Sequence, residues 1–200
     1  MKYKAVGFDY GGVIAGIPSS EFNRRITELL GVSIEAYKTV YFRNNHLLNH
    51  DTLSTDEFWS KVLNEMDRSD KLDDLLKFLK SLNQHEINND ILSLVKHLKA
   101  LGYKIGILSN NTLEGVERMR NAGLMKLFDV VAVSTEIGFS KPNPKAFDIF
   151  IEKLNISPQE LIFIDDTAKS LESAKEIGYQ PVVYTEFKKL QDELNRMGVL

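Results

Sequence analysis

The chain has 200 residues, of which 43% are hydrophobic and 26% charged, and its formal net charge at pH 7 is −3. These proportions are those of a globular chain with a sizeable core, and they exclude a disordered tail and a disulfide-bonded mini-protein. The chain has no cysteine, which excludes disulfides, thiolate metal sites and a cysteine nucleophile. It also has no basic excess and no apolar run of the roughly 18 residues that a membrane span needs. We therefore expect a cytoplasmic protein that binds neither nucleic acid nor a membrane.

Five short apolar segments predict the strands of a parallel sheet. They are rich in β-branched and aromatic residues and are apolar on both faces, as strands covered by helices on both sides are. The predicted strands are Tyr3–Phe8, Tyr103–Leu108, Val130–Val133, Leu161–Ile164 and Pro181–Tyr184, and the helical patterns between the later strands are Asn89–Leu101, Leu113–Ala122, Pro144–Leu154 and Ala168–Ile177. This alternation predicts an α/β fold with a doubly wound, Rossmann-like parallel sheet.

Residues 17–82 interrupt this alternation with helical patterns and no convincing strand. The four patterns are Ser20–Leu30, Ile34–Leu48, Asp56–Met66 and Lys71–Leu82. Ser54 and Glu57 predict a capping box at the start of the third helix. We predict an inserted all-helical cap domain over residues 17–82 and an α/β core domain formed by residues 1–16 and 83–200. The insertion follows the first strand, at the sheet edge where ligands bind in such folds.

Three of the predicted strands are followed by, or end in, polar residues. Asp9 follows the first strand, Ser109 the second, and Asp165 and Asp166 the fourth, while Lys141 lies in a loop pinned by two prolines. In a parallel sheet these strand ends meet at one edge. Each residue alone has an ordinary explanation as a turn residue, a helix cap or a solvated lysine. Two adjacent acids at a buried strand end, however, raise each other's pKa unless positive charge is nearby.

The charges at this edge point to phosphate chemistry. Three acids and a phosphate ester would carry more negative charge than a single lysine can neutralise. A hard cation with oxygen ligands, Mg²⁺, would balance the remaining negative charge. In such a pocket Asp9 would be the nucleophile. Ser109 and the backbone N–H groups near Asn110 would hold the phosphoryl oxygens. The following residue, Asn111, is explained equally well as a helix cap that pairs with Glu114.

Four motifs in this order resemble those of the haloacid dehalogenase (HAD) superfamily of hydrolases: FDYGGVI, ILSNN, GFSKPNP and FIDD. The resemblance spans essentially the whole core, and the insert resembles the helical cap of one subfamily. It implies that Asp9 is the nucleophile, that Asp166 binds the metal directly and that Asp165 binds it through water. It also implies that Lys141 neutralises the nucleophile and the phosphate, and that the backbone carbonyl of Gly11 is a metal ligand.

Gly11 also marks a departure from the family pattern. Phosphatases of this family usually have a second aspartate there, which protonates the leaving group and later activates water. General acid–base catalysis typically raises the reaction rate by about 10²–10⁴-fold. The glycine therefore predicts slower turnover or a substitute proton donor. Its effect is expected to be smallest for a substrate with a good leaving group, such as a sugar 1-phosphate or an acyl phosphate. In this feature the chain resembles the hexose-1-phosphate phosphatase group, and the chain as a whole also resembles the N-terminal phosphatase of epoxide hydrolases.

Three further residues of the predicted cap are candidates for substrate contacts. His46 and His50 are four residues apart, the spacing of two ligands on one helix face, but no third ligand is evident. The interpretation as surface or cap-lining histidines is therefore favoured. If it faces the core, His46 could supply the missing proton, because histidine titrates near neutral pH. Arg43 could contact a remote group of the substrate.

The sequence thus predicts a Mg²⁺-dependent phosphatase that hydrolyses a small phosphorylated metabolite through an aspartyl-phosphate, as a monomer or weak homodimer. One alternative is a non-catalytic phosphate-binding or regulatory protein that has lost the acid/base aspartate. A second is a haloacid dehalogenase, which uses the same aspartate without a metal and is disfavoured by the acid pair Asp165 and Asp166. A third is a two-component receiver domain, which is disfavoured by the helical insert.

Overall fold

A parallel sheet of five strands forms the centre of the protein. The structure is a computed structural model that describes residues 2–49, 52–82, 86–121 and 123–200. The strands are β1 (Ala5–Phe8), β2 (Lys104–Ser109), β3 (Val130–Val133), β4 (Leu161–Asp165) and β5 (Gln180–Val183), in the spatial order β3-β2-β1-β4-β5. All neighbours pair in parallel, which confirms the predicted fold class. Because β1 lies between β2 and β4, the carboxyl ends of these three strands are adjacent.

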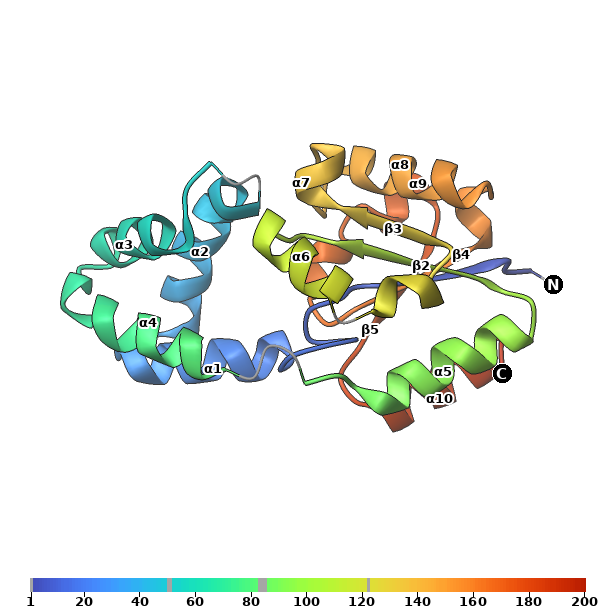
Figure 1. Cartoon of the computed structure of the whole chain (residues 1–200), viewed down its shortest axis with the longest axis horizontal. Helices are drawn as coiled ribbons and strands as arrows, with labels where there is room; N and C mark the ends of the chain where they lie inside the picture. Colours follow the sequence, from blue (N-terminus) through green and yellow to red (C-terminus); the bar gives the residue numbers. More distant parts are fainter. Residues whose placement is uncertain (1, 50–51, 83–85, 122) are drawn as a thin grey trace.

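Helices cover both faces of the sheet (Figure 1). On one face lie α5 (Asn89–Ala100) and α10 (Phe187–Arg196), and on the other lie α8 (Pro144–Leu154) and α9 (Ala174–Ile177). The remaining helices of this part are α6 (Leu113–Asn121), α7 (Ser134–Ile137), and the 3₁₀ helices η2 (Leu124–Leu127), η3 (Pro158–Glu160) and η4 (Ala168–Leu171). Within the described residues, no helix combines the length and the apolar character that crossing a membrane requires.

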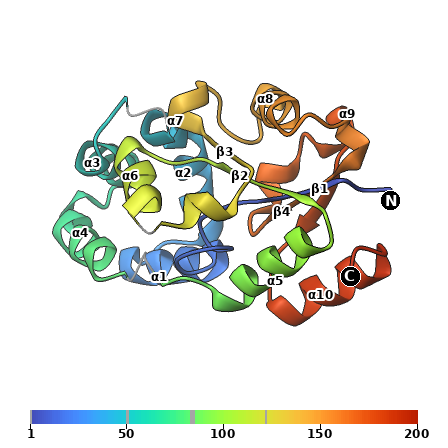
Figure 2. The same ribbon diagram turned by 45° about the vertical axis from the view of Figure 1, so that its right-hand side comes forward.

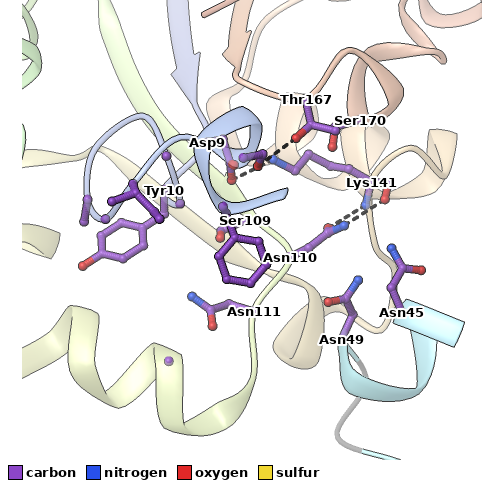
Figure 3. A pocket seen from close by; sticks show the side chains of 18 of the residues that line it. Asp9, Tyr10, Asn45, Asn49, Ser109, Asn110, Asn111, Lys141, Thr167 and Ser170 are labelled. Atoms are coloured by element: carbon purple, nitrogen blue, oxygen red, sulfur yellow. Dashed lines mark hydrogen bonds and ion pairs between the residues drawn. The ribbon is translucent and has the colours of Figure 1, made fainter. Parts of the chain in front are cut away.

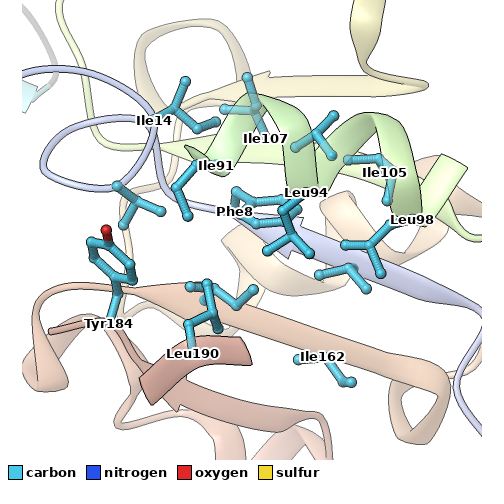
Figure 4. Close-up of a cluster of buried hydrophobic side chains, with 14 of the residues drawn as sticks. Phe8, Ile14, Ile91, Leu94, Leu98, Ile105, Ile107, Ile162, Tyr184 and Leu190 are labelled. Carbon is cyan, nitrogen blue, oxygen red and sulfur yellow. The ribbon is translucent and has the colours of Figure 1, made fainter. Parts of the chain in front are cut away.

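Alternate residues of β1 face the two layers of helices. Phe8 packs toward α5 and α10, in a cluster that includes Leu94 and Leu190 (Figure 4). On the other face Gly7 pairs in register with Gly106 of β2. A Cβ atom on either glycine would lie within 2.8 Å of the Phe150 ring. The two glycines therefore make room for this ring on α8 to lie directly against the sheet.

Two elements differ from the sequence prediction. The single helix predicted over Ala168–Ile177 is wrong, because its first turns close with i→i+3 hydrogen bonds and form η4, and α9 begins only after Ser173. Helix α10 was not predicted, although the buried residues Leu190 and Leu194 have the four-residue spacing of a helix face.

The helical insert consists of α1 (Ser19–Leu30), α2 (Ile34–Asn49), α3 (Thr55–Glu65), the 3₁₀ helix η1 (Ser69–Lys71) and α4 (Leu72–Ser81). Figure 1 shows these helices grouped beyond one edge of the sheet, and in Figure 2 α3 and α4 lie at the left, away from the strands. They enclose a hydrophobic cluster of their own, built around Tyr37, Phe58 and Leu63. The predicted capping box of Ser54 and Glu57 is present at the start of α3 and is thereby confirmed.

Two chain segments connect the insert to the sheet, and they lie side by side. The Gly16 N–H donates to the carbonyl oxygen of Glu86, and the Asn88 N–H donates to that of Ile14, each at 2.9 Å. An antiparallel bridge joins Ala15 to Ile87 between these two bonds. Both connections therefore leave the sheet beside the end of β1.

Candidate active site

The polar strand ends converge on one cavity between the sheet and the insert. Asp9 follows β1 directly, Ser109 is the last residue of β2, and both line a cavity of about 320 Å³ together with Lys141 (Figure 3). Asp165 is the last residue of β4 and lies beneath the cavity floor, with no exposed surface. The parallel register is the physical reason for this convergence, because residues far apart in the sequence end their strands at the same edge.

Lys141 bridges two of the carboxylates. Its Nζ lies 2.8 Å from Oδ1 of Asp9 and 2.6 Å from Oδ2 of Asp165. The lysine is only 4% exposed, so both ion pairs are shielded from water. The Thr167 N–H donates to the other oxygen of Asp165 at 2.8 Å, which fixes the orientation of that carboxylate. Each oxygen of the Asp165 carboxylate thus has a partner, one Lys141 and the other the Thr167 N–H. The direct role of this carboxylate is to hold Lys141 beside Asp9.

Asn110 holds the backbone of the lysine loop. Its side-chain Nδ2 donates to the carbonyl oxygen of Lys141 at 2.8 Å, and its Oδ1 accepts from the Lys141 N–H at 2.7 Å. This pair of bonds ties the end of β2 to the loop that follows β3. The Asn110 side chain is therefore occupied by the backbone, and a contact with phosphate through its own N–H stays a prediction.

The carboxylates of the site carry more negative charge than Lys141 balances. Burial raises the pKa of Asp9 to about 7, with Lys141 opposing the rise and Asp165 and Asp166 adding to it. Burial also raises the pKa of Asp166. Burial alone would lower the pKa of Lys141, but the carboxylates of Asp165 and Asp9 outweigh it and raise that pKa.

These residues fit a divalent cation. Oxygen atoms of Asp9, Asp165 and Asp166 all lie within 4.8 Å of one another. Oxygen ligands suit Mg²⁺, which is usually held by one or two carboxylates and keeps several waters. Three carboxylates lie around the single Lys141, and a cation would fill this deficit of positive charge. Gly11, whose carbonyl is the other predicted ligand, lines the same cavity.

A family model described as haloacid dehalogenase-like hydrolase matches residues 3–178. The chain belongs to this hydrolase family. A protein of Mycobacterium tuberculosis (strain CDC 1551) that is named as a phosphatase is 26% identical over 211 residues, which cover 100% of this chain and 97% of that protein. Bifunctional epoxide hydrolase 2 of Sus scrofa is 28% identical over 125 residues, 60% of this chain and 22% of that protein. The crystal structure of a dehalogenase superposes with a TM-score of 0.65 at 21% identity, covers 96% of this chain and 97% of that one, and shows the fold alone.

The insert supplies the side of the hydrolase cavity that faces away from the sheet. Figure 3 shows Asn45 and Asn49 on α2 near Asn110 and Lys141. Further lining residues from the insert are Ile17, Ser19, Phe22, Asn23, Tyr41, Phe42 and Leu82. Sequence reasoning missed these residues because neither an asparagine nor an aromatic residue in a helix indicates by itself which face lines a cavity. The helical pattern of α2 would have placed Asn45 and Asn49 on one face, four residues apart.

The other residues proposed from the sequence lie in different places. Arg43 is exposed, pairs with Glu65 at 3.6 Å and is not among the residues that line the cavity. His46 is exposed and lines a second cavity of about 390 Å³. This cavity adjoins the first, and both are lined by Phe42, Asn45, Asn49, Asn110, Lys141 and Ser170. His50 lies outside the described residues.

The cap of α6 differs from the one predicted. Thr112 occupies the cap position before Leu113, and its hydroxyl accepts from the Gly115 N–H at 3.2 Å. The Asn111 side chain instead accepts from the Thr112 N–H at 2.9 Å. Thr112 rather than Asn111 therefore directly precedes α6 and accepts a hydrogen bond from its first turn, while the side chain of Glu114, the other half of the expected capping box, lies outside what the structure describes.

Proposed function

We propose that this hydrolase is a Mg²⁺-dependent phosphatase that acts on a small phosphorylated metabolite through an aspartyl-phosphate. The observation that carries the proposal is the buried Lys141, which contacts Asp9 and Asp165 at the floor of the cavity, with Asp166 beside them. A nucleophilic carboxylate, a cation beside it and an all-oxygen metal site are the parts that phosphoryl transfer requires. The similarity to a protein named as a phosphatase supports the same conclusion.

In the first step, an Asp9 oxygen attacks phosphorus as the bond from phosphorus to the leaving oxygen breaks. The electron pair of that bond stays on the leaving group, which takes up a proton. Lys141 keeps the Asp9 carboxylate in place and offsets the charge of the transferred phosphoryl group. Ser109 and the backbone N–H groups after β2 hold the phosphoryl oxygens. Water then attacks the phosphorus, and the bond from Asp9 to phosphorus breaks to release inorganic phosphate and restore the carboxylate.

Asp9, Asp166 and the Gly11 carbonyl are the groups proposed to hold Mg²⁺, with Asp165 acting through water. When bound, Mg²⁺ supplies the positive charge that these carboxylates and the phosphate together lack. The acids adjacent at the end of β4 favour this chemistry over dehalogenation, which needs no metal.

The leaving group must obtain its proton without an aspartate at position 11. Among the described residues that line the cavity, the side chains with an ionisable proton other than Asp9 and Lys141 are those of Tyr10 and Tyr41. Burial raises the pKa of Tyr41 above its ordinary value, so its phenol is a weak acid. We therefore propose substrates whose leaving group departs readily, such as sugar 1-phosphates and acyl phosphates.

The test is phosphate release from a panel of phosphate esters and acyl phosphates by the purified chain, with Mg²⁺ and after chelation. We expect hydrolysis of some members of the panel that requires Mg²⁺. Asp9→Asn removes the nucleophile and should lower kcat by on the order of 10³-fold or more. Asp192→Asn is the matched control, because Asp192 is an exposed aspartate on α10 that pairs with Lys188.

Two outcomes would contradict the proposal. If no ester is hydrolysed while inorganic phosphate still raises the melting temperature, the chain is a phosphate-binding protein. If Asp9→Asn keeps the activity of the wild type, the covalent mechanism is wrong.

A further inference from the structure

The Asp166 carboxylate is held by Ser19, the first residue of α1 in the helical insert. The Ser19 N–H donates to Oδ2 of Asp166 at 2.5 Å, and the Ser19 hydroxyl donates to Oδ1 at 3.2 Å. The two residues are 147 positions apart in the chain. One residue thus contacts both oxygens of a carboxylate that the proposed mechanism assigns to the metal.

The surroundings of Asp166 leave its carboxylate little freedom. The Thr167 hydroxyl lies 3.2 Å from Oδ1 of Asp166 and 3.1 Å from the Ser19 hydroxyl. On another side, a Cβ atom built on Gly12 would lie only 2.1 Å from Oδ2, so the backbone of the loop after β1 packs directly against the carboxylate. Lys141 pairs with Asp9 and Asp165, and in the described part of the chain no ion pair is formed by Asp166. Ser19 and Thr167 are therefore the hydrogen-bond donors that orient it.

Ser19 also links this carboxylate to the substrate side of the cavity. It is the first residue of α1, and Phe22 and Asn23, one turn further along the same helix, line the cavity. The position of the Asp166 carboxylate and the position of α1 are therefore fixed by the same contact.

We propose that Ser19 is a positioning residue for the metal site: its N–H and hydroxyl hold Asp166 in the orientation in which the carboxylate binds Mg²⁺. The inference rests on the proposed function, since it takes Asp166 as a metal ligand. Each carboxylate oxygen has two lone pairs, so bonds from Ser19 leave lone pairs for the cation while removing rotational freedom. Mutation of a residue that hydrogen-bonds to a metal ligand typically lowers metal affinity or activity by about 10- to 100-fold.

The test is Mg²⁺ binding to the full chain without substrate, measured by titration calorimetry. Ser19→Ala removes the hydroxyl and should weaken Mg²⁺ binding by about tenfold. Ser19→Pro also removes the N–H, at a helix position where proline is tolerated, and should weaken binding further. Ser19→Thr keeps both donors and should restore the wild-type affinity. Ser20→Ala is the matched control, because Ser20 is the exposed neighbour in the same helical turn, and its affinity should equal that of the wild type.

Melting temperatures of the metal-free chains separate this role from a general loss of stability. We expect Ser19→Ala to melt near the wild type while its Mg²⁺ affinity falls. Wild-type affinity in both Ser19→Ala and Ser19→Pro would overturn the inference, as would an equal loss in Ser20→Ala. Failure of the proposed function looks different, because the wild type itself would then bind no Mg²⁺ or release no phosphate.

Discussion

Two adjacent glycines of the site differ sharply in what they tolerate. Gly12 has a φ of 72°, and a Cβ there would lie 2.1 Å from Asp166 Oδ2. We expect Gly12→Ala to displace this carboxylate, to abolish Mg²⁺-dependent hydrolysis and to cost about 1–2 kcal/mol in the free energy of unfolding. Gly11→Ala is the matched control for stability, since a Cβ there meets no atom within 4 Å and Gly11 has no positive φ. Urea unfolding of both variants would check this, and equal stability of the two would contradict it.

The open space at Gly11 permits a gain-of-function experiment. Gly11→Asp would place a carboxyl group beside the cavity, where it can protonate a leaving group. We expect it to raise kcat/KM, which reports the steps up to departure of the leaving group, by up to about 10²-fold for alkyl phosphates, whose leaving groups need a proton. The kcat/KM for p-nitrophenyl phosphate, whose leaving group needs none, should change little. A uniform change across both substrates would contradict this explanation.

Physical rules acting along the strands made the centre of the site predictable, whereas contacts across the fold were not. Asp9 and Lys141 could be placed together because parallel strands end at one edge and because unbalanced acids attract a cation. The contact between Ser19 and Asp166 could not be predicted, since it depends on where α1 begins after the segment that follows β1. The role of Asn110 was also hidden, because an amide that binds a backbone and one that binds phosphate are identical in sequence.

At the scale of elements, burial on both faces made the strands predictable, and each strand of the sheet was expected within a residue or two of its observed bounds. The helices were less predictable where local hydrogen bonding competes with the α-helical pattern. The segment after β4 forms η4 and α9, because the carbonyl oxygens of Thr167 and Lys169 accept hydrogen bonds from the N–H groups three residues later. A periodic pattern of apolar residues does not distinguish these two geometries over so few turns.

Ser134, at the start of α7, joins α2 of the insert to the loop after β2. Its hydroxyl donates to the carbonyl oxygen of Asn49 at 2.9 Å and accepts from the Asn111 N–H at 3.0 Å, and the side chain is fully buried. We expect Ser134→Ala to lower the free energy of unfolding by about 1–3 kcal/mol, because it leaves buried polar groups without a partner.

Thr135 provides the control for this prediction. Its hydroxyl is also buried, but it has no hydrogen-bond partner within the described part of the chain. Thr135→Val should therefore leave the stability unchanged or raise it. Urea unfolding compares the two variants, and a loss in Thr135→Val as large as that in Ser134→Ala would refute the role assigned to the Ser134 hydroxyl.

At the scale of the whole molecule, the net charge of −3 conceals a concentration of acids at one sheet edge. The same edge receives both connections to the insert, so the fold brings its unbalanced charge to the place where the insert can enclose a ligand. We propose that residues 17–82 act as a cap domain on a core of residues 1–16 and 83–200. The separate hydrophobic cluster of the insert supports this division.

This division predicts that the cap can open without unfolding the sheet. The cap cluster around Leu63 shares no described residue with the core cluster around Leu98, and both leucines are fully buried. Leu63→Ala should cost about 2–5 kcal/mol in its own cluster. Amide hydrogen exchange should then accelerate in α1 and α3, while β1 and β4 keep their protection, since cooperative units open separately. Leu98→Ala, the matched change in the core, should accelerate exchange in β1 and α5. If Leu63→Ala accelerates exchange in β1 as much as in α3, the chain unfolds as one unit and the two-domain division is wrong.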